Sequence, residues 1–348
     1  MRFKLAPTLA VVASGMVFPA AYAEEQSLAI EEVVVTARKQ EESSQDVPIA
    51  MTAISEQLEN STIRNLTDLN GFAPNVTIGE DGSRGGGGAV INIRGISPTR
   101  SDDNSFDAPI GVMIDGVYLG TLAGQVLENF DLERVEVLRG PQGTLFGKNT
   151  VGGVVNVIRS RPTGELGARL KATIGEDGQQ EFRAVVNTPV IEDVLAAKFF
   201  YTSQEDDGFM KNVTLGGDAA TKDYQNYGAA FLWTPNDKFE ATLTVEKFDD
   251  TSNLTAFNTN YNVAPGVLVA PADPNATDYS GGFLNCALAP QTCRTSLSTP
   301  KNSENDTENK AELVTDAITL NMSYQLNENL TIVSTTGYRD LEEYRIYD

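Results

Sequence analysis

The sequence predicts an exported protein built from a small α+β domain followed by antiparallel strands of an outer-membrane β-barrel. Three observations carry this prediction: an N-terminal secretion signal, a mixed region of short β runs with one helix, and a C-terminal half of long alternating strands. A chain of 348 residues is long enough to hold both parts.

Residues 1–23 have the pattern of a signal peptide. Arg2 and Lys4 precede a mostly apolar stretch, and Ala21 and Ala23 are small residues at the positions that a signal peptidase reads. The alternative is a membrane-spanning helix, which needs about 20 apolar residues, more than this stretch supplies. We therefore expect cleavage after Ala23 and export of the rest.

The composition excludes several functions. The formal net charge is −22, and an acidic chain does not follow a phosphate backbone, so we expect no nucleic-acid partner. There is no histidine, which removes Ser-His-Asp catalysis and any histidine-bound metal or haem. No other catalytic group of side chains stands out, so we predict neither an enzyme nor a bound cofactor.

Cys286 and Cys293 lie close together in a polar region. An exported protein meets oxidising conditions, so this spacing favours a local disulfide. The alternative is a pair of metal ligands, for which no further ligands lie nearby in the sequence.

Residues 24–45 form a charged tail that contains the run IEEVVVTARK, Ile30–Lys39. Valine has a high propensity for strands. Because the run lies in a tail ahead of the first domain, it suits pairing with the sheet of another protein. The alternative is an ordinary first strand of the domain that follows.

Residues 46–161 read as one α+β domain. A strand is expected in VPIAMTAIS, and a helix begins at Ser55 and ends near Gly71, because apolar residues recur at helical spacing between them. Short β runs then begin at Val76, Ala89, Ile110, Arg134 and Gly152.

Residues 162–348 read as about seven long strands with period-two alternation. In FEATLTVEKF, Phe239 and its alternate neighbours face one way, whereas Glu240 to Glu246 at every second position face the other. Tight turns are expected near 191–193, 235–238 and 327–329, and long polar loops near 205–221 and 250–309. This pattern is typical of an outer-membrane barrel. Aromatic residues near strand ends suit its interface girdles: Tyr201, Trp233 and Tyr324. A soluble sandwich is the alternative, with shorter strands and more even loops.

Two predicted loops partly resemble ligand-binding motifs. Gly140–Thr150 contains Gly147-Lys148, but a phosphate loop requires a glycine where this chain has Gln142. Ser101–Asp107 is acidic enough for calcium but lacks the EF-hand spacing, so we favour a solvated loop and predict no metal site.

Taken in order, these segments resemble the N-terminal part of a TonB-dependent outer-membrane transporter. IEEVVVTARK resembles the TonB box, and QDVPIAMTAIS resembles the start of the plug domain. INIRGI, IGVMIDGVYLG and DLERVEVLRGPQGTLFGKNTVGGVVNVI resemble the core segments of the plug.

The resemblance implies a fold and a mechanism. The plug, residues 46–161, would fill a barrel of about 22 strands, of which residues 162–348 supply about seven. The protein would take up a scarce nutrient, most often an iron–siderophore complex in this family, across the Gram-negative outer membrane. TonB of the inner-membrane energy-coupling complex would bind the box as an added strand. The box residues so implied are Ile30, Glu31, Glu32, Val33, Val34, Val35, Thr36 and Ala37.

The resemblance also implies site residues on the plug. Its outward loops would be Gly79–Ala89, Ser97–Asp107 and Tyr118–Gly124, with plain solvated loops as the alternative. The substrate-contact candidates are Ser83, Arg84, Arg100, Asp102, Asp103, Asn104, Phe106 and Tyr118. Arg94 and Arg139 would form ion pairs with carboxylates of the barrel wall. Glu240 and Glu246 face the predicted lumen without an assigned partner.

Seven strands cannot close a barrel of about 22. An open sheet in lipid leaves unpaired backbone groups at its edges. We therefore expect a fragment of a longer reading frame or a truncated product. The alternative function is a plug with a partial barrel that binds TonB or a ligand without transporting it.

Overall fold

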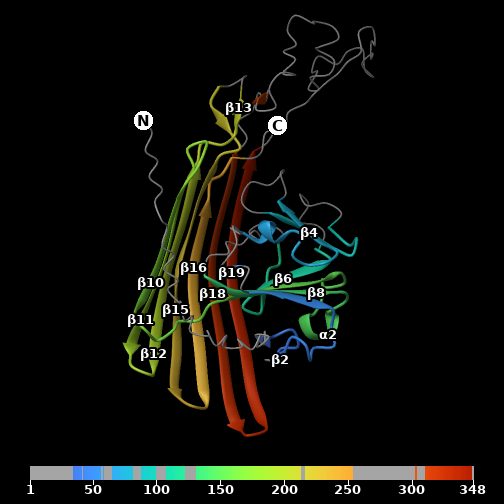
Figure 1. Ribbon diagram of the computed structural model, residues 1–348, viewed down its shortest axis with the longest axis vertical. Helices are drawn as coiled ribbons and strands as arrows, with labels where there is room; N and C mark the ends of the chain where they lie inside the picture. Colours follow the sequence, from blue (N-terminus) through green and yellow to red (C-terminus); the bar gives the residue numbers. More distant parts are fainter. Residues whose placement is uncertain are drawn as a thin grey trace, which may run out of the picture.

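The computed structural model describes residues 34–40, 42–55, 58, 65–80, 88–98, 107–121, 131–212, 216–253, 302–303 and 310–346. They form an N-terminal domain of short strands packed against one face of a tall sheet (Figure 1). The predicted signal peptide, residues 30–33 and both cysteines lie outside the described residues.

The N-terminal domain centres on a mixed five-stranded sheet in the order β3-β8-β9-β6-β7. β6 and β9 run parallel, and the other pairs are antiparallel. A second, two-stranded sheet joins β4 and β5. The bounds are β3 (Met51–Ile54), β4 (Val76–Glu80), β5 (Ala89–Ile93), β6 (Ile110–Ile114), β7 (Val117–Tyr118), β8 (Leu132–Arg139) and β9 (Gly153–Arg159), with the 3-10 helix η1 (Leu66–Leu69) and the short helix α2 (Gly143–Phe146).

Both faces of the five-stranded sheet are buried, which explains why its strands read as nearly continuous apolar runs. The larger cluster of buried residues covers one face and includes Val112, Val135 and Val157. The second cluster covers the other face. It consists of Val35, Ala37, Val47, Met113, Leu138, Phe146 and Val154. Strand alternation assigns neighbouring residues to opposite clusters.

The seven-stranded sheet, here called the wall, is antiparallel, and each strand pairs with its neighbours in sequence order. Its strands are β10 (Gly167–Ile174), β11 (Gln180–Ile191), β12 (Leu195–Asp206), β15 (Lys222–Asn236), β16 (Phe239–Asp250), β18 (Lys310–Asn327) and β19 (Leu330–Ile346). The three predicted tight turns connect β11 to β12, β15 to β16, and β18 to β19 at one end of the wall (Figure 1).

A small three-stranded sheet lies at the opposite end of the wall (Figure 1). Within it β13 pairs antiparallel with β14 and parallel with β17. The bounds are β13 (Met210–Asn212), β14 (Asp218–Ala219) and β17 (Asn302–Ser303).

The two faces of the wall differ in chemistry. Lys198, Thr244 and Glu246 are on the face that meets the N-terminal domain, and Lys198 and Thr244 are buried. The face turned away exposes large apolar side chains at alternate positions, among them Leu170, Phe182, Phe199, Leu243, Ile318 and Ile332. An apolar outer face and a polar inner face are what a strand in a lipid-facing barrel requires. Among the described residues, no helix is long and apolar enough to cross a membrane.

Aromatic side chains gather near the short turns of the wall. The Phe239 ring lies 5.3 Å from that of Trp233 and 6.4 Å from that of Tyr324, between ring centroids. Tyr201 is farther along its strand, with its ring 6.1 Å from that of Phe182. Trp233 and Tyr324 are thus placed as a girdle at one end of the wall requires.

Gly153 makes the close pairing of β8 and β9 possible. Its φ is +152°, and a Cβ there would lie 2.3 Å from the carbonyl oxygen of Leu138. We expect Gly153→Ala to destabilise the domain by about 1–3 kcal/mol, because the backbone of Leu138 must move to admit the methyl group. Urea denaturation measures the loss. Gly143→Ala is the matched control, since nothing lies within 4 Å of its Cβ position. Equal stability of the two variants would contradict the steric argument.

Candidate functional site

The second half of the box segment, defined here as Ile30–Ala37, is docked on the N-terminal domain. Val34 and Val35 form β1 (Val34–Val35), which pairs antiparallel with β2 (Glu42–Ser43). Val35 and Ala37 are completely buried in the second cluster, whereas Val34 is 45% exposed. The described half therefore lies folded on the domain and does not extend away from it. Burial of its apolar side chains stabilises that position.

Thr36, between these two buried residues, contacts a carboxylate from β8. Its backbone N–H donates to Oε1 of Glu136 at 2.7 Å, and its hydroxyl lies 3.2 Å from the same oxygen. Arg134 Nε also donates to this oxygen, at 2.8 Å, and Asn156 Nδ2 donates to Oε2 at 3.2 Å. Glu136 is completely buried, and these donors compensate its charge.

The residues after the box segment hold it at the surface of the domain. The Lys39 ammonium lies 4.4 Å from the centre of the Phe146 ring, a cation–π distance. Arg38 pairs with Glu42 at 3.1 Å. The Arg38 and Lys39 side chains are exposed, so we expect each contact to contribute little to stability.

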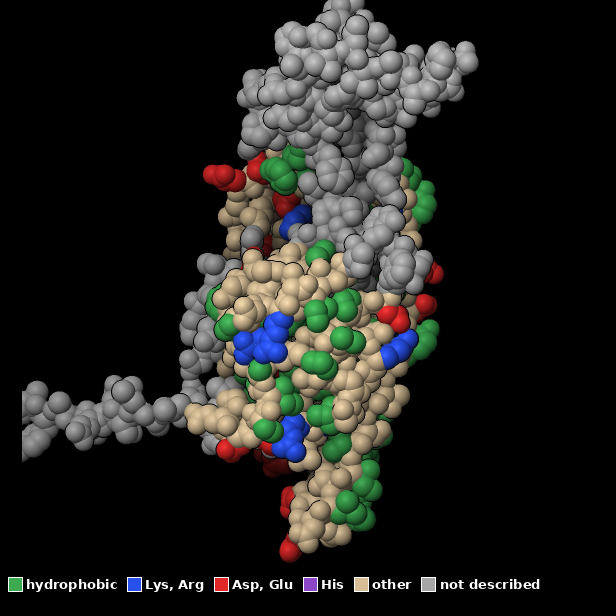
Figure 2. Space-filling view, turned by 90° about the vertical axis from the view of Figure 1, so that its right-hand side faces the viewer, with side chains coloured by type: hydrophobic (Ala, Val, Ile, Leu, Met, Phe, Trp, Pro, Cys, Tyr) green, Lys and Arg blue, Asp and Glu red, His purple; other side chains and the backbone are tan. Residues whose placement is uncertain are grey.

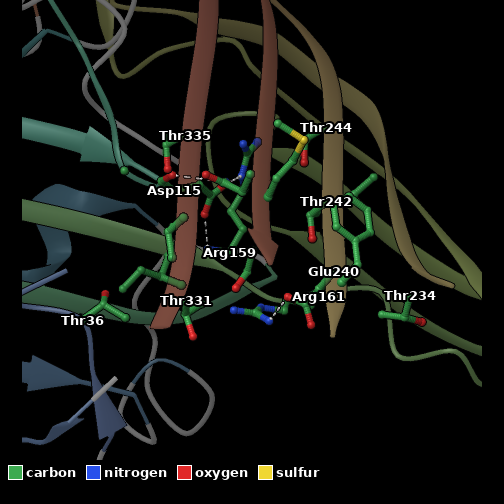
Figure 3. A pocket seen from close by; sticks show the side chains of 18 of the residues that line it. Thr36, Asp115, Arg159, Arg161, Thr234, Glu240, Thr242, Thr244, Thr331 and Thr335 are labelled. Atoms are coloured by element: carbon green, nitrogen blue, oxygen red, sulfur yellow. Dashed lines mark hydrogen bonds and ion pairs between the residues drawn. The ribbon is translucent and has the colours of Figure 1, made fainter. Parts of the chain in front are cut away.

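Arg159 joins the N-terminal domain to the wall. Its Nε donates to Oδ2 of Asp115 at 2.6 Å (Figure 3). Its Nη1 donates to Oε2 of Glu246, also at 2.6 Å. Burial alone would lower the pKa of Arg159, but the carboxylates of Asp115 and Glu246 outweigh it and raise that pKa. The guanidinium therefore stays charged between two carboxylates, one from each body.

Asp131 is the centre of a second contact between the two bodies. Lys198 Nζ lies 2.5 Å from Oδ2 of Asp131, and Arg169 Nη2 lies 2.9 Å from its Oδ1. Ser160 donates its hydroxyl to the same carboxylate at 2.5 Å, and Lys198 also donates to the Ser160 carbonyl. Two wall cations thus converge on one carboxylate of the N-terminal domain.

The third contact is more exposed. Arg161 Nη1 lies 2.5 Å from Oε1 of Glu240, with side chains 52% and 40% exposed. Around it a cavity of about 1520 Å³ separates the domain from the wall. Wall threonines line it, among them Thr242, Thr244, Thr331 and Thr335 (Figure 3).

The two predicted ion-pair arginines make no ion pair with the part of the wall that the structure describes. Arg139 donates to the backbone carbonyls of Pro74 and Met51, at 3.2 and 3.1 Å, so it links two segments of its own domain. Arg94 is exposed and makes no ion pair with any residue that the structure describes. The described ion pairs to the wall are made by Arg159, Arg161 and Asp131 instead. Glu246 and Glu240 are two of the wall partners, in agreement with their predicted inward orientation.

Most substrate-contact candidates lie outside the described residues: Ser83, Arg84, Arg100, Asp102, Asp103, Asn104 and Phe106. Tyr118 is described. It packs against the second cluster, and its hydroxyl accepts from Asn149 Nδ2 at 3.3 Å. The structure thus brings Tyr118 to the cluster that also contains Val35.

Sequence reasoning missed Glu136 and Asn156, although a signal was present. Each is a single polar residue inside an apolar run, RVEVLRG and GVVNVIR, and a buried polar residue needs a partner. Nothing in the sequence alone assigns that partner, because Thr36 lies 100 residues before Glu136.

The side of the N-terminal domain that faces away from the wall carries its Lys and Arg side chains in small separate groups (Figure 2). The described residues therefore form no continuous basic surface on this side. A continuous basic surface is what binding along a nucleic-acid backbone would require.

Comparison with known proteins defines the domain. Residues 43–154 match the TonB-dependent Receptor Plug Domain. Over 292 residues the chain is 28% identical to the vitamin B12 transporter BtuB of Vibrio vulnificus (strain CMCP6), a match that covers 80% of this chain. The chain belongs to the TonB-dependent receptors. We call the N-terminal domain the plug from this point on.

Further similarities agree with this assignment. The chain is 28% identical over 189 residues to the pesticin receptor of Yersinia pestis, covering 53% of this chain and 27% of that protein. The crystal structure of the ferric yersiniabactin uptake receptor FyuA from Yersinia pestis superposes with a TM-score of 0.66 at 18% identity. That match covers 85% of this chain and 41% of FyuA, and it supports the fold. The predicted fold class, a plug with part of a barrel, is confirmed.

The chain spans less than half the length of these relatives: 45% of BtuB, 27% of the pesticin receptor and 41% of FyuA. TonB-dependent receptors are proteins of the Gram-negative outer membrane and are not enzymes, as the sequence predicted. The predicted domain boundaries remain predictions.

Proposed function

We propose that this chain is part of a TonB-dependent transporter that takes up a scarce nutrient across the outer membrane. The observation that carries the proposal is the position of the box segment. Val34–Ala37 dock on a plug, and charged groups hold that plug to the inner face of a wall with an apolar outer face. Energy transfer requires a segment that a periplasmic partner can reach, joined to the element that blocks the lumen.

In the proposed mechanism, substrate binds on the outer side, at plug and barrel loops. The box segment then leaves the plug, and TonB pairs with it as an added strand. Force transmitted through that strand moves or partly unfolds the plug, and substrate passes. The candidate outer contacts Ser83, Arg84, Arg100, Asp102, Asp103, Asn104 and Phe106 belong to this step of the proposal.

For the substrate we propose an iron–siderophore complex. The similarity to the ferric-pyoverdine 358 receptor of Pseudomonas putida, 26% identical over 187 residues, supports this choice. The similarity to a vitamin B12 transporter favours a second candidate, a cobalamin.

Uptake by whole cells tests the function and the substrate together. Cells expressing the receptor are given labelled ferric siderophores or labelled cobalamin, with and without TonB and with a protonophore. We expect accumulation of one class, lost without TonB and lost when the proton gradient collapses. Binding without accumulation in all conditions would favour the alternative, a protein that binds TonB or ligand without transport.

A further inference from the structure

Glu136 lies on the face of the plug sheet that receives the box segment. Its neighbours Val135 and Val137 face the larger cluster, so Glu136 faces the opposite side with Leu138 and the second cluster. The side chain is completely buried. A carboxylate in such a place is unfavourable unless donors surround it, and its donors therefore indicate what the site is built to hold.

Two of these donors belong to the plug and one belongs to the box segment. Arg134 and Asn156 hold the carboxylate from β8 and β9, at 2.8 and 3.2 Å. Thr36 adds its backbone N–H at 2.7 Å, the shortest of the three contacts. Arg134 also reaches the Thr36 hydroxyl at 3.4 Å. Because an ionised acceptor strengthens a hydrogen bond, this contact is stronger than a backbone pair of β1.

The docked position also occupies backbone that a partner strand needs. Val34 and Val35 pair with Ser43 and Glu42, and the amide of Thr36 is bonded to Glu136. A strand added to this segment would have to take over such groups. When Thr36 leaves, Glu136 keeps its hydrogen bonds to Arg134 and Asn156, so its carboxylate is not left without a donor. The box segment can therefore dock again.

We propose that Glu136 is the latch of the box segment, a positioning residue whose bonds to the amide and the hydroxyl of Thr36 keep the segment docked. The strength of these bonds then sets how often the segment is available to its partner. The partner's identity rests on the proposed function, whereas the latch is a property of the plug alone.

Trypsin cleavage after Arg38 and Lys39 measures the latch directly, since these residues follow the box segment and cleavage requires a locally undocked chain. The receptor is digested in detergent-solubilised outer membranes without TonB, so that trypsin reaches the periplasmic side. We expect Glu136→Gln to speed cleavage there by at least about tenfold, because the neutral amide is a weaker acceptor for the Thr36 N–H. Glu133→Gln is the matched control. It removes the same charge from the same strand and touches Arg134, but not Thr36.

Thr36→Ala provides a second variant that leaves the plug interior intact. It removes only the hydroxyl contacts to Glu136 and Arg134, so we expect cleavage about two- to threefold faster than in the natural protein. If Glu136→Gln does not fold, the cleavage rate of Thr36→Ala tests the proposal. Cleavage at the natural rate in the folded variants, or an equal increase in Glu133→Gln, would overturn the latch.

The cleavage experiment tests the latch separately from the proposed transport function. Faster cleavage in a receptor that accumulates no substrate would keep the latch and reject transport. Unchanged cleavage in a receptor that transports would reject the latch and keep the function.

Discussion

Val35→Pro is expected to abolish energised uptake while leaving substrate binding to cells intact. Proline has no N–H to donate to an added strand, and it removes the paired backbone position opposite Glu42. We expect uptake to fall by about 100-fold or more, because strand addition depends on backbone donors rather than side chains. Substrate binding should change by less than about twofold. In the proposed mechanism substrate binds at the outer loops, whereas the box segment acts on the periplasmic side. Labelled-substrate uptake and binding at low temperature measure the two quantities.

Val34→Ala is the control for this experiment. Val34 neighbours Val35 in β1 but is 45% exposed, and alanine keeps its N–H. We expect uptake close to that of the natural protein. Undiminished uptake in Val35→Pro would rule out a role of the box segment in energy coupling.

Arg159→Met is expected to produce the largest loss of plug stability. It leaves the carboxylates of Asp115 and Glu246 without the cation that both contact at 2.6 Å, and all three side chains are only 14–16% exposed. Removing one partner of a buried ion pair costs about 3–5 kcal/mol. Because the three side chains keep some contact with water, we expect the lower end, about 3 kcal/mol. Hydrogen exchange of the β9 amides in urea measures the loss.

Arg161→Met is the matched control, two residues along the chain. It breaks the pair with Glu240, which is about half exposed, and such pairs contribute at most about 1 kcal/mol. A smaller loss in Arg161→Met would show that the buried ion pairs of Arg159 stabilise the plug more than the exposed pair of Arg161 does. Similar losses in both variants would count against Arg159 as the main attachment.

The wall was predictable because its signal is local. Alternation along each strand separates an apolar from a polar face, and this places Glu240 and Glu246 on the inner side without knowledge of any partner. The tight turns follow from polar residues between alternating runs. The plug strands are predictable for the same reason, as short apolar runs between loops.

The partners of the buried charges were not predictable. In the sequence Arg159 only ends an apolar run, yet in the structure it pairs with Glu246 of the wall. Arg139 reaches carbonyls of Pro74 and Met51 because these segments pass beside the end of β8. Which segments pass there depends on packing between residues far apart in the chain.

The sequence by itself determined an exported chain, a domain of short strands, a wall of alternating strands and a valine-rich segment suited to strand pairing. Each depends on neighbours within a few residues, where periodicity and propensity act. The tertiary structure alone decided that Val35 and Ala37 are buried on the plug, that Thr36 meets Glu136, and that Arg159 bridges the plug to the wall. The two hydrogen bonds join residues 100 and 87 positions apart, and only the packing of both bodies brings such groups within hydrogen-bonding distance.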